Sequence, residues 1–93
     1  MPEPNLPDQE SAEILALSGL AWLASAPERL NAFMDLTGIS KDELQLGAAT
    51  PHVQSSILGH FLQDETVLLM FAADTGISPT DIAPAHHVLQ NAS

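Results

Sequence analysis

The chain has 93 residues, enough for one domain, and it contains no cysteine, which excludes a disulfide framework, a thiolate nucleophile and cysteine-ligated zinc. Twelve carboxylates face only two strong bases, Arg29 and Lys41, for a formal net charge of −10. Nucleic-acid binding depends on lysine and arginine contacts to phosphate, and anionic membranes repel an acidic surface, so we expect neither partner. A basic protein partner is compatible with the charge.

Residues 1–8 are acidic and rich in proline, and we expect them to form a disordered or loosely attached arm. A secretory signal peptide begins basic and then becomes apolar, and a membrane-spanning helix needs about 20 apolar residues. Neither pattern is present in the sequence. We therefore expect a cytoplasmic protein with a single helical domain at residues 9–90 and a frayed tail at residues 91–93.

The first predicted helix begins at about Asp8 or Ser11 and runs to Ala24. Its apolar residues surround the helix axis almost completely: Ile14, Leu15, Leu17, Leu20, Ala21, Trp22 and Leu23. A helix that is apolar on most sides usually lies at the centre of a core. We therefore expect this helix to be the central element of the fold.

The next two helices are predicted from their end signals. Ser25 and Glu28 have the spacing of a capping box, which predicts a second helix from Ser25. Gly38 favours the left-handed conformation that ends helices, so this helix should stop at about Thr37. Ser40 and Glu43 form another capping box and predict a short third helix.

Three further helices are predicted in the second half. The pair Thr50-Pro51 begins the fourth helix, and Asp64 caps a fifth that stops near Gly76. Ser78 begins a sixth helix, which Pro84 should bend or end within two turns. Almost no sequence is left for strands, so the predicted fold is all-α, a compact bundle of five or six short helices.

Residues 37–40 and 75–78 both read Thr-Gly-Ile-Ser. The similarity extends in register to Leu30 with Leu68, Phe33 with Phe71, and Leu44 with Ile82. Two pseudo-symmetric units of three helices would account for this, as would the chance recurrence of a common helix–helix joint. Both interpretations stay open at this point.

The fifth predicted helix is apolar where its counterpart in the first half is more polar. Val67, Leu69 and Met70 correspond to Arg29, Asn31 and Ala32. Either the fifth helix is buried more deeply or it presents apolar surface to a partner, since exposed apolar patches usually mark interaction sites. We take Val67, Leu69 and Met70 as the candidate interface, for a protein partner or for a homodimer formed through the fifth or the first helix.

The four histidines do not have the spacing of a metal site. His52 and His60 are eight residues apart on one helix, which separates them by about 12 Å, and His86 and His87 are adjacent. We expect no metal. Ser56, His60 and Asp64 have helical spacing and could imitate a catalytic triad, but Asp64 already has a sufficient role as a helix cap. We expect no catalytic residue, no cofactor and no enzymatic activity.

Asp35 and Asp74 both lie in the last turn of a predicted helix, where the helix dipole disfavours negative charge. Arg29 is the only arginine. We expect a structural ion pair between Arg29 and one of these two aspartates.

Residues 68–88 imitate a helix-turn-helix, with Ala72, Gly76 and Ile82 at the spacing of that motif. The second helix of the motif, residues 78–88, has no lysine or arginine to contact phosphate, so we expect the geometry without DNA binding. The preferred function is a non-enzymatic protein-interaction or accessory module. The alternative is a transcription-related regulator with a helix-turn-helix-like fold that acts through a basic protein partner.

Two stretches of the chain carry a family resemblance. The first comprises residues 24–30, Phe33, residues 36–38 and Leu44; the second comprises Phe61-Leu62, Asp64-Glu65, Leu68, Phe71-Ala72 and Gly76. Over residues 11–83 the sequence resembles a family of short, all-helical, mostly alphaproteobacterial proteins classed as a domain of unknown function. The resemblance implies a compact helical bundle in a bacterial cytoplasm and brings no catalytic residues.

Overall fold

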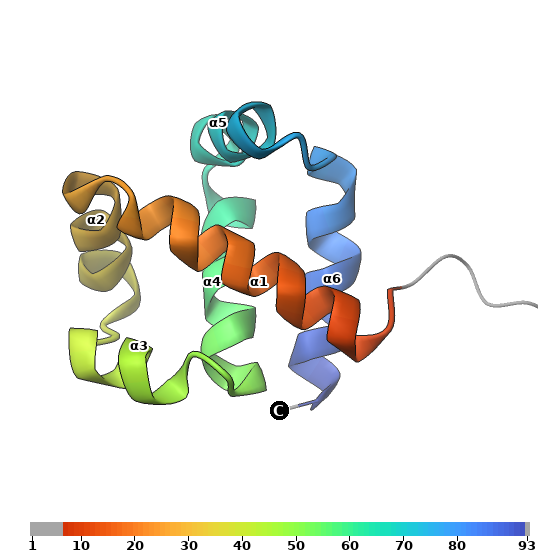
Figure 1. The fold of residues 1–93 in the computed structure, drawn as a ribbon, viewed down its shortest axis with the longest axis horizontal. Coiled ribbons are helices and arrows are strands. Elements are labelled where there is room, and N and C mark those ends of the chain that lie inside the picture. Colours follow the sequence, from red (N-terminus) through yellow and green to blue (C-terminus); the bar gives the residue numbers. More distant parts are fainter. Residues whose placement is uncertain (1–6, 93) are drawn as a thin grey trace, which may run out of the picture.

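The computed structural model describes residues 7–92, a range that is helical with no strand (Figure 1). The helices are α1 (Gln9–Ala24), α2 (Pro27–Thr37), α3 (Lys41–Gly47), α4 (Pro51–Gln63), α5 (Glu65–Thr75) and α6 (Ile82–Ala92), with the 3-10 turn η1 (Pro79–Asp81) before α6. The predicted all-α bundle is confirmed. Most of the expected arm, residues 1–6, lies outside the described residues, as does Ser93.

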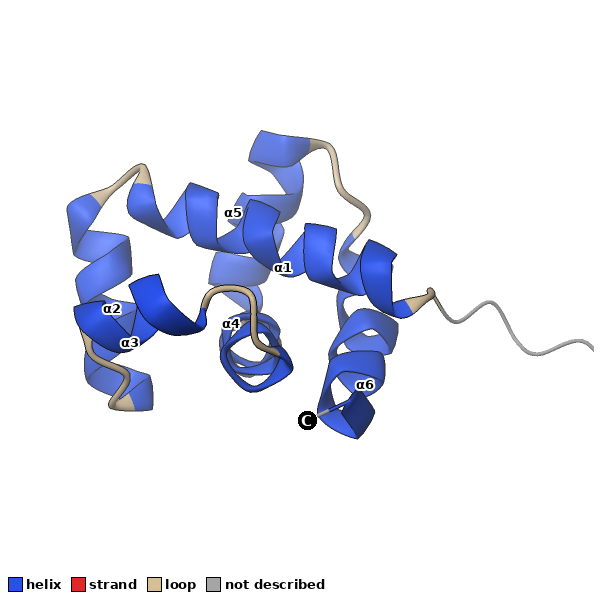
Figure 2. Cartoon of the chain, turned by 60° about the horizontal axis from the view of Figure 1, so that its bottom comes forward, coloured by secondary structure: helices blue, strands red, loops and turns tan. Residues whose placement is uncertain are grey.

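Helices α1, α4 and α6 form the centre of the bundle. Helices α4 and α6 pack side by side and α1 crosses both of them (Figures 1 and 2). The crossings are close because two glycines lie in them: a Cβ atom at Gly19 would lie 2.7 Å from Phe61, and one at Gly59 would lie 3.1 Å from the His86 ring. In the part of the chain that the structure describes, no helix combines the length and the hydropathy needed to cross a membrane.

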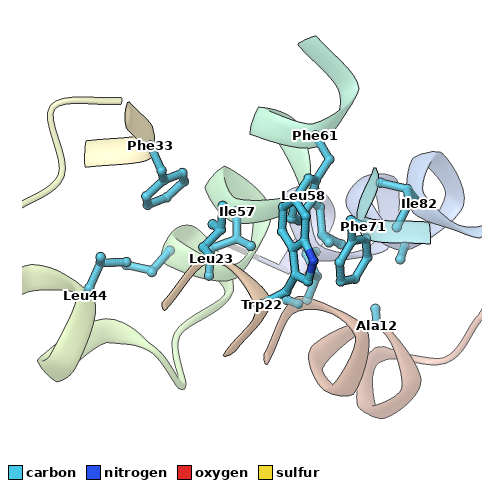
Figure 3. Packing of buried hydrophobic residues seen from close by; sticks show 14 of the residues in the cluster. Ala12, Trp22, Leu23, Phe33, Leu44, Ile57, Leu58, Phe61, Phe71 and Ile82 are labelled. Carbon is cyan, nitrogen blue, oxygen red and sulfur yellow. The ribbon is translucent and has the colours of Figure 1, made fainter. Parts of the chain in front are cut away.

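An aromatic cluster joins α1, α4 and α5 (Figure 3). The rings of Phe61 and Phe71 stack with centroids 4.6 Å apart, and Trp22 packs on both at 5.8 Å and 5.6 Å. Phe33 of α2 is also fully buried and meets the ring of His60 edge-on at 5.2 Å. Burial of these large side chains is the main stabilising contribution in a bundle of this size.

Most helix ends lie where the sequence predicts them. Gly38 and Gly76 end α2 and α5 with φ of 75° and 76°. Both hydrogen bonds of the capping box of Ser40 and Glu43 are present, at 3.1 Å and 3.0 Å. Thr50 and Asp64 cap α4 and α5 as predicted.

The predicted capping box at Ser25 is wrong. The N-cap of α2 is Ala26, which makes no side-chain cap hydrogen bond. Ser25 ends α1 instead, and its hydroxyl donates to the carbonyl oxygen of Trp22 at 2.6 Å. The backbone of Ser25 is still helical, so its side chain reaches back to the preceding turn and not forward to α2.

Pro84 neither ends nor interrupts α6, which continues to Ala92. The sequence placed the start of the last helix at Ser78, which would put Pro84 well inside it. Residues 79–81 form η1 instead, and α6 begins at Ile82. Pro84 therefore lies in the first turn of α6, where a missing N–H costs no intrahelical hydrogen bond.

Candidate functional site

Helix α5 presents part of the candidate interface to solvent. It buries Phe71 and Ala72, whereas Leu69 is 50% exposed and Met70 43% exposed. Val67 is half-buried and packs against the core. Deeper burial of α5 therefore accounts for Val67 but not for Leu69 and Met70, which form an apolar face of α5 directed away from the bundle.

Helix α1 belongs to the centre of the bundle, as expected, but it also exposes apolar residues. Its buried residues are three small ones and two large ones: Ala12, Ala16, Gly19, Trp22 and Leu23. On its outer side, Ile14 is 58% exposed and Leu17 is 43% exposed. Helix α1 lies across α4 and α6 (Figure 1), and the face that meets these two helices is the buried one.

Trp22 brings together two of the residues predicted to form an ion pair. Its indole N–H donates to the carboxylate of Asp74 at 2.8 Å, and the guanidinium carbon of Arg29 lies 4.1 Å from the centre of its ring. Asp35 is exposed on α2. A pairing of Arg29 with either aspartate stays a prediction.

The Trp22 contacts explain a position that the sequence left unexplained. Asp74 lies at the unfavourable end of α5, but there it accepts a hydrogen bond from a largely buried indole. A buried tryptophan normally needs such an acceptor. Two sequence signals, one tryptophan on an apolar helix and one carboxylate at a helix C-terminus, could have been combined to predict the contact.

A polar groove of about 520 Å³ lies between α4, α6 and the end of α2. Its lining includes three of the four histidines, His52 and His60 from α4 and His86 from α6, together with Ser55, Ser56, Gly59, Gln63, Gln90, Leu36 and Thr37. Sequence reasoning missed this groove because its residues come from separate helices. The one available signal was Gly59, which lets the His86 ring approach α4.

Burial favours the neutral form of two imidazoles in this groove. Burial lowers the pKa of His60, which is only 8% exposed, and the carboxylate of Asp64 partly offsets that effect. Burial also lowers the pKa of His86, with a further contribution from neighbouring His87. Both rings are therefore available at neutral pH as hydrogen-bonding groups without charge.

Ser56, His60 and Asp64 do not form a catalytic relay in this arrangement. The hydroxyl of Ser56 donates to the carbonyl oxygen of His52 at 3.1 Å. Asp64 caps α5 by accepting the backbone N–H groups of Thr66 and Val67, and it does not line the groove. Within residues 7–92, no three His, Asp or Glu side chains come together as a group that could hold a metal ion.

The helix-turn-helix comparison can be made between α5 and α6. Ala72 and Ile82 are buried on either side of the joint, at the positions that pack in that motif. The second helix begins at Ile82 and carries no lysine or arginine. The motif thus supplies packing residues and no phosphate contacts.

A protein-family profile matches most of the chain. The sequence profile of DUF3572, described as a protein of unknown function, matches residues 9–92. No curated protein and no solved structure matches the chain. The profile covers all six helices of the structure, and the chain belongs to the DUF3572 family.

Proposed function

We propose that this protein is a non-enzymatic protein-interaction or accessory module of a bacterial cytoplasm, with α5 as its contact helix. One observation carries the proposal: Leu69 and Met70 are about half exposed on the outer side of a helix whose inner side is anchored by Phe71. Apolar side chains gathered on an exposed helix face usually mark a contact surface.

The composition of α5 suits such a contact. Removing apolar surface from water contributes about 25 cal/mol per Å², so two large side chains can anchor a small interface. Methionine is flexible and adapts to the surface it meets. The capping of α5 by Asp64 and its left-handed stop at Gly76 hold this face in place without using Leu69 or Met70.

The test compares a double variant and a single variant of the full chain. Leu69→Gln with Met70→Gln removes the apolar face, and Leu46→Gln is the matched control, because Leu46 is 86% exposed on α3. Molar mass in solution reports a homodimer, and crosslinking in the native cell reports another partner. We expect the α5 variant to lose the dimer or the crosslinked product and the control to keep it. Equal behaviour of both variants and the wild type would reject α5 as the contact helix.

A second candidate function is a regulator with a helix-turn-helix-like fold that acts through a basic protein partner. The buried positions of Ala72 and Ile82 at the α5–α6 joint favour it, together with the net charge of −10. This regulator would not bind duplex DNA itself. A low-micromolar complex with duplex DNA at low salt would show direct DNA binding and contradict both candidates.

A further inference from the structure

An apolar groove of about 780 Å³ runs between the first half of α1 and the α5–α6 joint. Its apolar lining comes from Pro7 before α1, Ile14 and Leu15 of α1, Ile77 of the joint, and Pro84 and Ala85 of α6. Ala85 is fully buried, whereas Ile14 is the most exposed large apolar side chain of α1. The groove is separate from the outer face of α5, since neither Leu69 nor Met70 lines it.

One carboxylate lines this groove, and two others adjoin residues that line it. Asp81 lines it on the η1 side. On the α1 side, Asp8 follows Pro7 and Glu10 precedes Ser11, two residues that line the groove. Glu10 also lies one helical turn before Ile14 and so shares its face. The backbone N–H of Ser11 donates to Asp8 at 2.8 Å and holds the pKa of that carboxyl below its ordinary value, so its charge persists into mildly acidic solution.

The two basic residues of the chain lie elsewhere. Arg29 stacks on Trp22, and Lys41 begins α3; neither lines the groove. The groove therefore combines an apolar lining with Asp81 on its η1 side and with Asp8 and Glu10 next to its α1 side. This arrangement is complementary to a helix with one apolar stripe flanked by lysine or arginine.

We propose that the groove between α1 and the α5–α6 joint binds a basic amphipathic helix of another protein, whose apolar side chains enter beside Ile14 and Pro84 and whose cations pair with Asp81, Asp8 and Glu10. This surface is additional to the α5 face of the proposed function. A second copy of this chain is a poor occupant of this groove, because its only lysine and arginine, Lys41 and Arg29, offer too few cations to pair with these carboxylates.

The binding experiment uses the full chain and a synthetic amphipathic helix of leucine and lysine, about 18 residues or five turns long. Two control peptides separate the contributions. A leucine–glutamate peptide keeps the apolar stripe and reverses the charge, and a lysine–serine peptide keeps the charge and lacks the stripe. We expect the leucine–lysine peptide to bind at least about tenfold more tightly than either control, and added salt to weaken it.

Three variants place the binding in the groove. Ile14→Gln should weaken the leucine–lysine peptide about tenfold, and Asp81→Asn about two- to threefold at low salt. Leu46→Gln, on α3, should bind like the wild type. Ile14, Asp81 and Leu46 are all exposed, so each variant should keep the wild-type melting temperature. Amide chemical shifts should change mainly at residues 11–18 and 76–85.

Each contrary result has its own meaning. If the lysine–serine peptide bound as tightly as the leucine–lysine peptide, net charge alone would explain the binding and the proposal would be overturned. Unchanged binding of the leucine–lysine peptide by Ile14→Gln would also overturn it. Shift changes confined to residues 65–75 would place the peptide on the α5 face and overturn the groove while supporting the proposed function. A free wild-type dimer that Ile14→Gln dissociates would make a second copy the occupant and also overturn the proposal.

Discussion

The two Thr-Gly-Ile-Ser joints have the same sequence and nearly the same local structure. Gly38 and Gly76 have φ of 75° and 76° and ψ of 5° and 7°. In each joint the threonine hydroxyl donates to the carbonyl oxygen of a buried phenylalanine four residues earlier, Phe33 or Phe71, at 2.7 Å. Four residues with the same side chains thus build the same helix end twice.

The helices that come after the two joints differ in length and in burial. The first joint leads into α3, seven residues at the edge of the bundle that contact α4. The second leads through η1 into α6, which packs against both α1 and α4. Helix α3 buries one leucine, Leu44, whereas α6 buries Ile82, Ala85 and Leu89. The conformation of each joint therefore depends on its own four residues. The apolar pattern of the residues that follow determines how much of the next helix is buried in the core.

The largest effects are expected at the paired phenylalanines. Phe33→Ala and Phe71→Ala should each lower the free energy of unfolding by about 3–5 kcal/mol, because both side chains are fully buried. Phe71→Ala should cost more, since it also loses ring contacts with Phe61 and Trp22. Urea unfolding followed by circular dichroism measures the difference.

Controls keep that comparison measurable. Leu46→Ala, at an 86% exposed position, should change the free energy of unfolding by less than about 0.5 kcal/mol. If an alanine variant does not fold, Phe33→Leu and Phe71→Leu give the same ranking at lower cost. A larger loss at Phe33 than at Phe71 would show that the aromatic cluster is not the stronger of the two anchoring points.

The next effects are expected at the two glycines. Gly38→Ala and Gly76→Ala should each cost about 1–2 kcal/mol, because alanine is disfavoured at positive φ. Among the described residues, no heavy atom beyond the two chain neighbours lies within 4 Å of a Cβ built at either position, so contacts with the rest of the fold should add nothing. The two losses should agree within about 0.5 kcal/mol. Unequal losses in urea unfolding would show that the joints differ in strain despite their matching geometry.

The sequence predicted the helix ends well because their signals are local. Gly38, Gly76, Ser40 and Asp64 act within one turn of their own position, and the structure places each in its predicted role. Ser25 shows the limit, because a serine between two helices can close the first or cap the second. The local pattern of spacing does not distinguish these two roles.

The surfaces could not be predicted in the same way. Helix α1 is apolar on almost all sides, so its pattern does not reveal that Ile14 and Leu17 face outward. The polar groove with its three histidines requires α4 and α6 to pack closely at Gly59. The hydrogen bond between Trp22 and Asp74 joins residues 52 positions apart in the sequence. These features depend on how distant helices meet, which short-range periodicity does not specify.

A smaller effect distinguishes the serines of the two joints. Ser40→Ala should cost about 1 kcal/mol, since its hydroxyl accepts the backbone N–H of Glu43. Ser78→Ala should cost less than about 0.5 kcal/mol, because the Ser78 hydroxyl contacts that of Thr80 and caps no backbone group. Thermal unfolding of both variants measures this difference. Equal losses would mean that Ser78 also stabilises the start of its helix.

Arg29→Ala should cost about 0.5–1 kcal/mol through loss of its contact with the Trp22 ring. If the contact with the ring carries this effect, the loss should persist when Asp74 is changed to Asn and should change little with salt. If an ion pair with Asp74 carries it, the loss should vanish in the Asp74→Asn background and at high salt. Thermal unfolding followed by tryptophan fluorescence distinguishes these results. An unchanged melting temperature of Arg29→Ala would show that neither interaction contributes to stability.

The smallest effect on stability at neutral pH is expected from His60. This effect concerns the neighbours of the two phenylalanines, because only one of the two packs against a histidine. Phe33 packs against this histidine, whereas Phe71 packs against rings that do not titrate. Burial lowers the pKa of His60 in the folded protein below the ordinary value of 6.5. Well above that value the ring is neutral in both the folded and the unfolded state, so protonation of His60 does not make the stability depend on pH there. As the pH falls below 6.5, the unfolded state takes up the proton first, and stability is lost.

His86 contributes in the same direction, because burial also lowers its pKa. His60→Gln should therefore reduce, but not abolish, the fall in melting temperature between neutral pH and the range where carboxylates begin to protonate. His52→Gln, at an exposed position of the same helix, is the control for replacing a histidine by glutamine there. If His60→Gln showed the full wild-type fall in melting temperature, the imidazole of His60 would take up a proton as easily in the folded chain as in the unfolded one. Its contact with Phe33 would then add no pH dependence to the stability of the bundle.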